Sequence, residues 1–219
     1  GTEVRGYDKM KQLVWFWMAL CENNNRLADE VQNLREQYQI RNGDVVTGCS
    51  KESFHQYRED LKTESFMFSY ERAAKYYAIN RASFSGATFS GGWSEKASYA
   101  RFTDSSVQRL RDFKAKNFRV DYADFQDAME YHPNAFLYLD PPYMLEGSQN
   151  SLYGIDGNLH SSFDHDRLHG LLTKRSGWVM SYNDCIEIRK MYKDYEIIEA
   201  EWSYGMNKSK QSSEILIKG

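Results

Sequence analysis

The sequence predicts an α/β protein: a Rossmann-like sheet with helices on both faces, interrupted by a mostly helical insertion. The first observation is an unbroken apolar run of strand length, Phe136–Leu139, that ends abruptly in Asp-Pro-Pro. The second is a pair of short strand patterns, Thr2–Asp8 and Phe118–Val120, that also run into acidic residues. The third is the helical periodicity of the segments between them. Open α/β sheets bind ligands at the carboxyl ends of their strands, so these acids indicate where a site should lie.

The residues after the apolar run, Asp140-Pro141-Pro142-Tyr143, should form a stiff turn. Each proline fixes its own φ and keeps the preceding residue out of the helical region, so the carbonyls of Asp140 and Pro141 point in nearly fixed directions. Such acceptors can hold an amino group on a planar heterocycle while Tyr143 stacks on the ring. The simpler alternative is a Pro-Pro turn in which Asp140 is a cap and Tyr143 covers the core.

This turn resembles the Asp-Pro-Pro-Tyr signature of the S-adenosylmethionine-dependent methyltransferases that act on exocyclic amino groups, above all the Dam-like DNA adenine methyltransferases. The resemblance extends over nearly the whole chain from Gly6 onward. Its other segments are Gly6-Tyr7-Asp8, Asn80–Phe84, Asp124-Phe125, Ser181–Asp184 and Ser213–Ile217. It implies S-adenosylmethionine as the cofactor, double-stranded DNA as the partner, and Asp140, Pro141, Pro142 and Tyr143 as the catalytic group, with Asp140 also at the cofactor.

Length and composition fit a globular chain of 219 residues, long enough for one large core and an insertion. No apolar run approaches the length of a membrane helix, and no signal peptide pattern opens the chain, so we expect a cytoplasmic protein without a membrane partner. The three cysteines lie far apart, which predicts neither a disulfide framework nor a zinc site. His165 and His169 share a helix face without a third ligand, so we expect no metal.

The first strand, Thr2–Asp8, closes on a carboxylate and is followed at once by a helical pattern with apolar residues from Met10 to Leu20 on one face. In nucleotide-binding folds this layout presents an acid to the ribose hydroxyls, and the resemblance also assigns Asp8 to the cofactor. The alternative is that Asp8 only caps the helix.

In the Dam-like family, a first strand and a glycine-rich loop that cradle the methionine part of the cofactor precede this position. No Gly-x-Gly occurs ahead of Asp8, and Gly91-Gly92 follows no apolar strand. We therefore expect that a preceding segment or a second chain supplies this motif, or that the cofactor is bound unconventionally.

Residues 36–105 are predicted to be the target-recognition insertion, and residues 1–35 and 106–219 the catalytic domain. Glu22–Tyr38 and Lys51–Asn80 look helical, with a glycine-containing break at Asn42–Gly48. The polar, aromatic stretch that follows matches the part of the family that approaches DNA. The phosphate or base-edge candidates in it are Arg81, Ser94, Lys96 and Arg101.

Charge supports a DNA-facing side within a chain whose formal net charge is only -3. The window Arg72–Arg119 holds ten basic and three acidic residues, a balance of +7. Acidic residues gather elsewhere, in Asp121–Glu130 and Asp184–Glu201. Such segregation indicates a phosphate-facing surface, although a charge run is also what a solvated face looks like.

The remaining elements follow the same reading. A helix should begin at Asp104 and run to Ala115, and the Asp124-Phe125 pair is assigned to the adenine of the cofactor by resemblance, with a helix start as the alternative for Asp124. Met144–Ser162 is predicted to be a lid over the substrate. The later elements are a helix at Asp164–Lys174, a strand at Trp178–Ser181, a helix at Asn183–Asp194, and closing strands at Tyr195–Glu201 and Glu214–Lys218.

These expectations combine into a site-specific DNA adenine methyltransferase in which the base flips into the pocket. Asp140 and the Pro141 carbonyl would accept the two amino hydrogens and free the nitrogen lone pair for an in-line attack on the sulfonium methyl. The alternatives are an enzyme that methylates amino groups of cytosine, RNA or glutamine, a non-catalytic DNA-binding module, or one half of a split methyltransferase.

Overall fold

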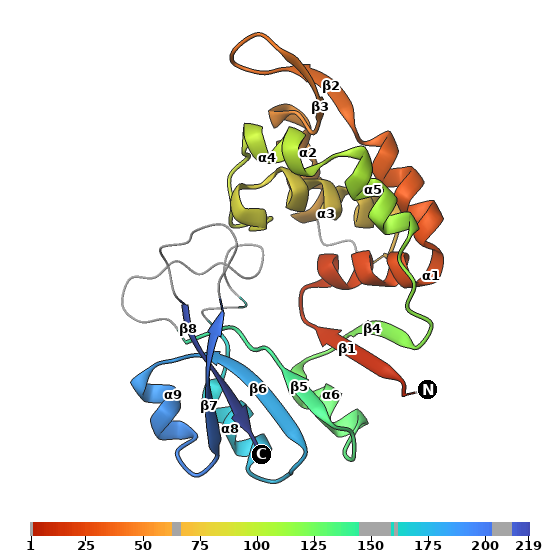
Figure 1. The fold of residues 1–219 in the computed structure, drawn as a ribbon. Helices are drawn as coiled ribbons and strands as arrows, with labels where there is room; N and C mark the ends of the chain where they lie inside the picture. Colours follow the sequence, from red (N-terminus) through yellow and green to blue (C-terminus); the bar gives the residue numbers. More distant parts are fainter. Residues whose placement is uncertain (1, 63–66, 145–158, 160–161, 203–211) are drawn as a thin grey trace. The chain divides into compact units, whose positions relative to one another are not determined.

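Figure 1 shows the computed structural model of the protein, which describes residues 2–62, 67–144, 159, 162–202 and 212–219. These residues form two compact units, the first ending at Asp124 and the second beginning at Phe125. Both units contain helices and strands, which confirms the predicted α/β class. No helix among the described residues is long and apolar enough to cross a membrane.

The first unit contains a parallel pair of strands, β1 (Val4–Asp8) and β4 (Phe118–Tyr122), both predicted, with Gly6 opposite Val120. Between them in the chain, helix α1 (Lys11–Asn33) packs against helix α3 (Tyr70–Ala82). The backbone of α1 is interrupted at Asn23, where φ is -153°. The Asn24 amide nitrogen lies next to the interruption and donates to the carbonyls of Leu110, Arg111 and Phe113, which ties α1 to the end of helix α5 (Asp104–Arg111).

A β-hairpin replaces part of the helix predicted for Glu22–Tyr38 and the break at Asn42–Gly48. Its strands β2 (Glu36–Gln39) and β3 (Val45–Gly48) are antiparallel, with Tyr38 opposite Val46. The turn uses an Asn-Gly pair, in which Gly43 has a φ of +93° and the Asn42 side chain accepts from the Asp44 amide. The prediction was wrong because β2 is almost entirely polar, so the turn signal at Asn42-Gly43 lacked an apolar strand before it.

Helices α2 (Lys51–Lys62) and α3 lie where the sequence predicted helix, in Lys51–Asn80. A 3₁₀ turn η1 (Phe84–Gly86) and helix α4 (Glu95–Arg101) follow in the polar stretch, for which no helix was predicted. Helix α5 begins as predicted but is capped by Thr103, which forms a capping box with Ser106, and it ends at Arg111 rather than Ala115. A hydroxyl one residue earlier thus takes the capping position that Asp104 was expected to hold.

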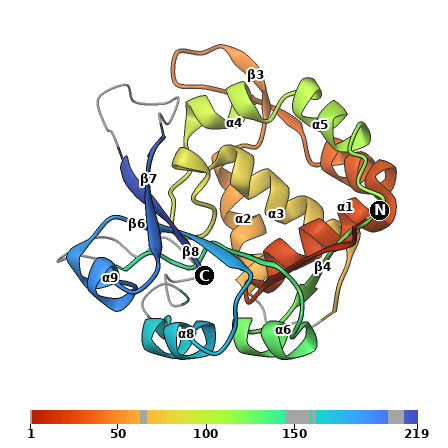
Figure 2. The same ribbon diagram turned by 60° about the horizontal axis from the view of Figure 1, so that its bottom comes forward.

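The second unit is a four-stranded sheet in the order β5-β6-β8-β7 (Figures 1 and 2). Its elements are α6 (Phe125–Tyr131), β5 (Leu137–Leu139), α8 (His165–Leu172), β6 (Trp178–Asn183), α9 (Ile186–Met191), β7 (Glu196–Trp202) and β8 (Ser212–Lys218). Strands β5 and β6 are parallel, and β8 is antiparallel to both of its neighbours. Apolar residues of α8 and α9 pack with β6 and β8 in one core, which includes Leu168, Ile188, Trp178 and Ile217.

Strand β5 is less buried than its apolar sequence predicted. Leu137 and Leu139 pack against the core, but the side chains of Phe136 and Tyr138 are 69% and 68% exposed. Within the second unit, β5 pairs only with β6 among the described residues, and its alternate residues point away from the core of that unit. The apolar run had indicated a buried strand because it shows apolarity and not pairing.

Candidate active site

The predicted catalytic turn begins where β5 ends, beside β6. The Ser181 hydroxyl of β6 lies 3.0 Å from Asp140 Oδ1 and 3.4 Å from the Leu139 carbonyl oxygen. A carboxylate only accepts hydrogen bonds, so Ser181 donates its single proton, and the shorter, charge-assisted contact is to Asp140. Ser181 is 7% exposed while Asp140 is exposed. A buried hydroxyl therefore orients a carboxylate that remains open to an incoming group.

The next carbonyl of the turn is held by a buried phenol. The Tyr182 hydroxyl lies 3.3 Å from the Pro142 carbonyl oxygen and also contacts His165 Nδ1. Burial raises the pKa of Tyr182 above its ordinary value, so this group keeps its proton and acts as a donor. Because Pro142 can only accept, all three groups are satisfied when His165 carries a proton on Nδ1 and donates to Tyr182.

The aromatic ring of Tyr143 is also fixed by Tyr182. The two rings stack with centroids 5.5 Å apart at 25°. Just beyond, the Asn183 amide nitrogen donates to the Met144 carbonyl at 3.3 Å. The Asn183 Oδ1 atom is buried and has no hydrogen-bond partner among the described residues. Within the described structure, no donor contacts the Pro141 carbonyl oxygen. The turn therefore has open hydrogen-bond acceptors beside a fixed aromatic ring.

Besides Asp140, three residues were assigned to the cofactor, and they lie at the end of β1 and just after β4. Asp8 Oδ1 accepts from the Met10 amide at 2.6 Å, but Met10 itself is the N-cap of α1 and no side chain caps that helix, so Asp8 is not the helix cap of the alternative reading. Asp124 forms an ion pair with Lys9 at 3.0 Å in the first unit. Phe125 opens the second unit, where Phe163 lies 5.2 Å from its ring and the Arg167 guanidinium 4.5 Å above it. These contacts leave the cofactor assignment a prediction.

The four DNA-binding candidates lie in the first unit and differ in how they are used. Ser94 is the N-cap of α4 and accepts from the Ala97 amide, while Lys96 is exposed. The Arg101 guanidinium donates to the carbonyls of Asn80, Arg81 and Ser83 at 2.6 to 3.1 Å. That set of contacts is structural and ties α4 to the end of α3.

Arg81 lies close to Arg101, is partly buried, and contacts the Asn80 side chain at 3.4 Å through Nη2. Its guanidinium stands 5.5 Å from the ring of Tyr77, and its Nε is buried without a partner among the described residues. The pKa of Arg101 is lowered, first by burial and second by the neighbouring charge of Arg81. Two like charges held together in this way favour an anion, and this keeps Arg81 as a phosphate candidate.

A residue that the sequence analysis did not select is Phe84, in the loop between α3 and α4. Its side chain is 69% exposed. The neighbouring backbone is strained, because Ser85 and Thr88 have φ values of 52° and 49° although neither is glycine. The available signal was an aromatic residue between serines in a turn ahead of Gly86, a position where burial is not expected.

The positive window is only partly available to a ligand. Arg72 lies 4.9 Å from the ring of Trp15, and Lys75 and Arg111 pair with Asp60 and Asp29, each at 2.7 Å. The window residues that have no ion pair within the described structure include Lys96, Arg109, Lys114, Lys116 and Arg119. Several of the basic side chains from which the sequence predicted a DNA-binding face are therefore engaged in contacts within the protein.

Two other predictions concern residues near the turn. Most of the predicted lid, 145–158 and 160–161, lies outside the described residues, and so does His160. Among the described residues, no three histidine, cysteine or acidic side chains are grouped as a metal ion would require.

Comparison with models of known protein families gives a match over most of the chain. A family model described as D12 class N6 adenine-specific DNA methyltransferase matches residues 1–206. No curated protein matches the chain significantly. The match spans β1, the insertion, the Asp140 turn and β6.

Proposed function

Because this chain belongs to the D12 class of N6 adenine-specific DNA methyltransferases, we propose that it moves a methyl group from S-adenosylmethionine to a flipped adenine in double-stranded DNA. The observation that carries the proposal is the inventory of acceptors at Asp140–Tyr143. Ser181 orients Asp140, and Tyr182 occupies the Pro142 carbonyl. Asp140 and the Pro141 carbonyl remain for an amino group with two hydrogens.

Asp140 and the Pro141 carbonyl need only accept hydrogen bonds from the adenine amino group. The lone pair of the adenine amino nitrogen is delocalised into the ring, which makes the nitrogen a weak nucleophile. Acceptors at Asp140 and Pro141 hold both hydrogens and favour a pyramidal nitrogen whose lone pair points away from the ring plane. Tyr143, supported by Tyr182, stacks on the base and replaces the stacking lost on leaving the duplex. Orientation then supplies most of the remaining rate, and no covalent intermediate with the protein is required.

The residues fit a sulfonium nucleoside by the chemistry of their acceptors. Asp8 would take the ribose hydroxyls, and Asp124 and Phe125 the adenine amino group and ring. The buried, unserved Asn183 Oδ1 is a further acceptor beside the turn, suited to an ammonium or amino donor. The cofactor supplies an already activated methyl group. Every step assigned to this chain is binding, orientation or hydrogen-bond acceptance.

The methionine end of the cofactor needs a separate holder. The Gly91-Gly92 pair serves a different purpose, because a Cβ on Gly91 would lie 3.1 Å from the Phe84 carbonyl oxygen, inside the loop after η1. Gly91-Gly92 therefore shapes that loop and is not proposed to hold the methionine end of the cofactor.

The insertion 36–105 is assigned to DNA recognition, and residues 1–35 and 106–219 to catalysis. Phe84 is suited to act as an apolar wedge, since side chains of this kind insert between base steps and help to unstack them. The loop that carries Phe84 is held by two arginines. Arg101 donates to the Ser83 carbonyl, and Arg58 donates to the carbonyls of Phe89 and Gly91. Arg81 and Lys96 would neutralise phosphates nearby.

One experiment tests the reaction as a whole. DNA incubated with the active enzyme and labelled cofactor is digested to nucleosides, and the methylated product is identified by mass spectrometry. N6-methyldeoxyadenosine is the expected product. N4-methyldeoxycytidine, or label recovered in the protein alone, would overturn the proposal. A DNA site with 2-aminopurine at the target should brighten on binding if the base leaves the stack.

A further inference from the structure

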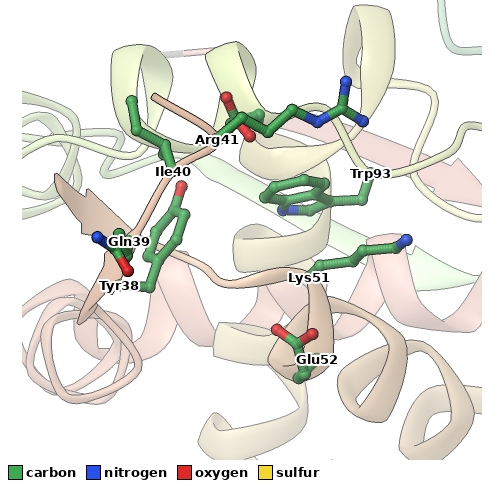
Figure 3. A pocket seen from close by; sticks show the side chains of 8 residues that line it. Tyr38, Gln39, Ile40, Arg41, Lys51, Glu52 and Trp93 are labelled. Carbon is green, nitrogen blue, oxygen red and sulfur yellow. The ribbon is translucent and has the colours of Figure 1, made fainter. Parts of the chain in front are cut away.

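The first unit contains a second candidate site, distinct from the Asp140 turn. A hollow of about 570 Å³ opens between the hairpin and the first residues of α2 and α4. Figure 3 shows that Trp93 lies between the side chains of Arg41 and Lys51, with Tyr38 on the hairpin side. Its lining residues are Tyr38, Gln39, Ile40, Arg41, Lys51, Glu52, Trp93 and Glu95. A volume of this size accommodates a small organic ligand.

The two aromatic walls of the hollow are fixed in position. The indole Nε1 of Trp93 donates to the Cys49 carbonyl at 3.0 Å, and the Tyr38 hydroxyl donates to Ser98 Oγ at 2.8 Å. The rings stand 6.3 Å apart at 62°. The polar group of each side chain already forms a hydrogen bond within the protein, so a ligand would contact the rings through their apolar surface.

The frame behind these walls is buried and closely packed. Ser98 Oγ donates to the Cys49 carbonyl at 2.6 Å and accepts from the Cys49 amide at 2.8 Å. Both residues are fully buried. A Cβ on Gly48 would lie 2.8 Å from the Ser98 carbonyl oxygen, so only glycine allows the hairpin to approach α4 this closely. The hollow is therefore preorganised and not a gap between mobile side chains.

The charges around the hollow favour one class of ligand. Arg41 and Lys51 are balanced by Glu52 and Glu95, so the formal charge of the lining is zero. A simple anion would be attracted only weakly, because the acidic residues cancel the basic ones. An apolar ligand would form no interaction with the four charged side chains. A nucleotide has a phosphate at one end, a stacking face in the middle, and, in cytosine or adenine, an amino group that carboxylates accept.

We propose that this hollow binds one unpaired nucleotide with an amino-bearing base. The base stacks on Trp93, Glu52 or Glu95 accepts from its amino group, and Arg41 and Lys51 hold its phosphate. The ligand is a nucleotide of a DNA strand or a free mononucleotide, which share this chemistry. The inference rests on the proposed function only in taking DNA as the partner.

The test follows the indole N–H signals of the protein by NMR and does not depend on methyl transfer. The signal of Trp93 is assigned by its loss in Trp93→Phe. Titration with dCMP or dAMP should shift this signal, with TMP about 10-fold weaker. Inorganic phosphate should leave it unchanged. An equal response to phosphate and dCMP, or no response to any nucleotide at millimolar concentration, would overturn the proposal.

Binding of oligonucleotides shows whether the ligand is a nucleotide of a DNA strand or a free mononucleotide. A single-stranded oligo-dC that binds at least 10-fold more tightly than dCMP identifies DNA as the ligand, whereas equal affinity per site identifies the free nucleotide. Arg41→Gln and Lys51→Gln should weaken both, and Lys190→Gln, at an exposed residue of α9 that is not part of the lining, is the matched control. Tyr38→Phe keeps the ring and should bind nearly normally. Unchanged affinity in both Arg41→Gln and Lys51→Gln would refute the phosphate contact.

Discussion

The turn after β5 and the loop after α3 are both held rigidly, but they treat their carbonyl groups in opposite ways. In the turn, two prolines supply the stiffness, and the Asp140 carboxylate and Pro141 carbonyl stay open. In the loop, the guanidinium groups of two arginines supply the stiffness by donating hydrogen bonds to the carbonyls. Arg101 serves Asn80, Arg81 and Ser83, and Arg58 serves Phe89 and Gly91.

This contrast indicates what each region can do. A segment with unserved acceptors can hold a donor such as an amino group, so it suits chemistry on a base. A loop whose acceptors are filled presents only side chains, here the exposed ring of Phe84 and the charge of Arg81. The loop therefore suits contact with a duplex, and the following substitutions test that division.

The largest expected effect is at Asp140. Asp140→Ala in the active enzyme should lower kcat by about 1,000-fold, because an acceptor for the reacting amino group is lost. The DNA dissociation constant should stay within about 3-fold, since this group does not face phosphates. Ser181→Ala, which only releases the carboxylate, is the milder companion. Parallel losses of binding and turnover would make Asp140 a structural residue.

Arg101 should show the opposite pattern. Arg101→Ala removes the donor of the Arg81 carbonyl and one of two donors to each of the Asn80 and Ser83 carbonyls, and is expected to lower the free energy of unfolding by about 2 kcal/mol. Urea denaturation followed by circular dichroism measures it. Arg109→Ala, on the exposed face of α5, should change stability by less than about 0.5 kcal/mol. If both variants unfold alike, the guanidinium contacts do not hold the loop.

Tyr143 tests whether the turn uses its ring or its hydroxyl. Tyr143→Ala should weaken transfer by about 2 kcal/mol through lost stacking, whereas Tyr143→Phe retains the ring and should be nearly unaffected. Single-turnover rates on a defined DNA site distinguish the two. Equal damage in both variants would point to the hydroxyl and away from stacking.

The smallest effect is expected at Arg81. Arg81→Ala should weaken DNA binding by about 1 kcal/mol and reduce the slope of log affinity against log salt by about 1, as for one lost phosphate contact. Arg81→Lys preserves the charge and should keep the slope. A slope that does not change in Arg81→Ala would remove this residue from the DNA face.

Sequence reasoning succeeded where a local signal was strong. The strand ends at Asp8 and Asp140 were predicted because an apolar run and an acid adjoin. The hairpin at β2–β3 was missed because its strands are short and polar, and their pairing depends on contacts such as that of Tyr38 with Ser98, sixty residues away.

Other roles depend on partners that no local pattern specifies. Arg81 and Arg101 look alike in the sequence, yet Arg81 lies over the ring of Tyr77 and Arg101 donates to three carbonyls. The functions of Ser181 and His165 likewise arise only when β6 and α8 bring them to the turn. Neither residue is near Asp140 in the chain.

The contacts of Tyr182 have a consequence for how the turn can be perturbed. This one side chain contacts the Pro142 carbonyl and His165 through its hydroxyl and stacks on Tyr143 through its ring. Two successive residues of the turn are therefore held by a single residue of β6. A change at Tyr182 would disturb both of them together and leave the contact of Ser181 with Asp140 in place.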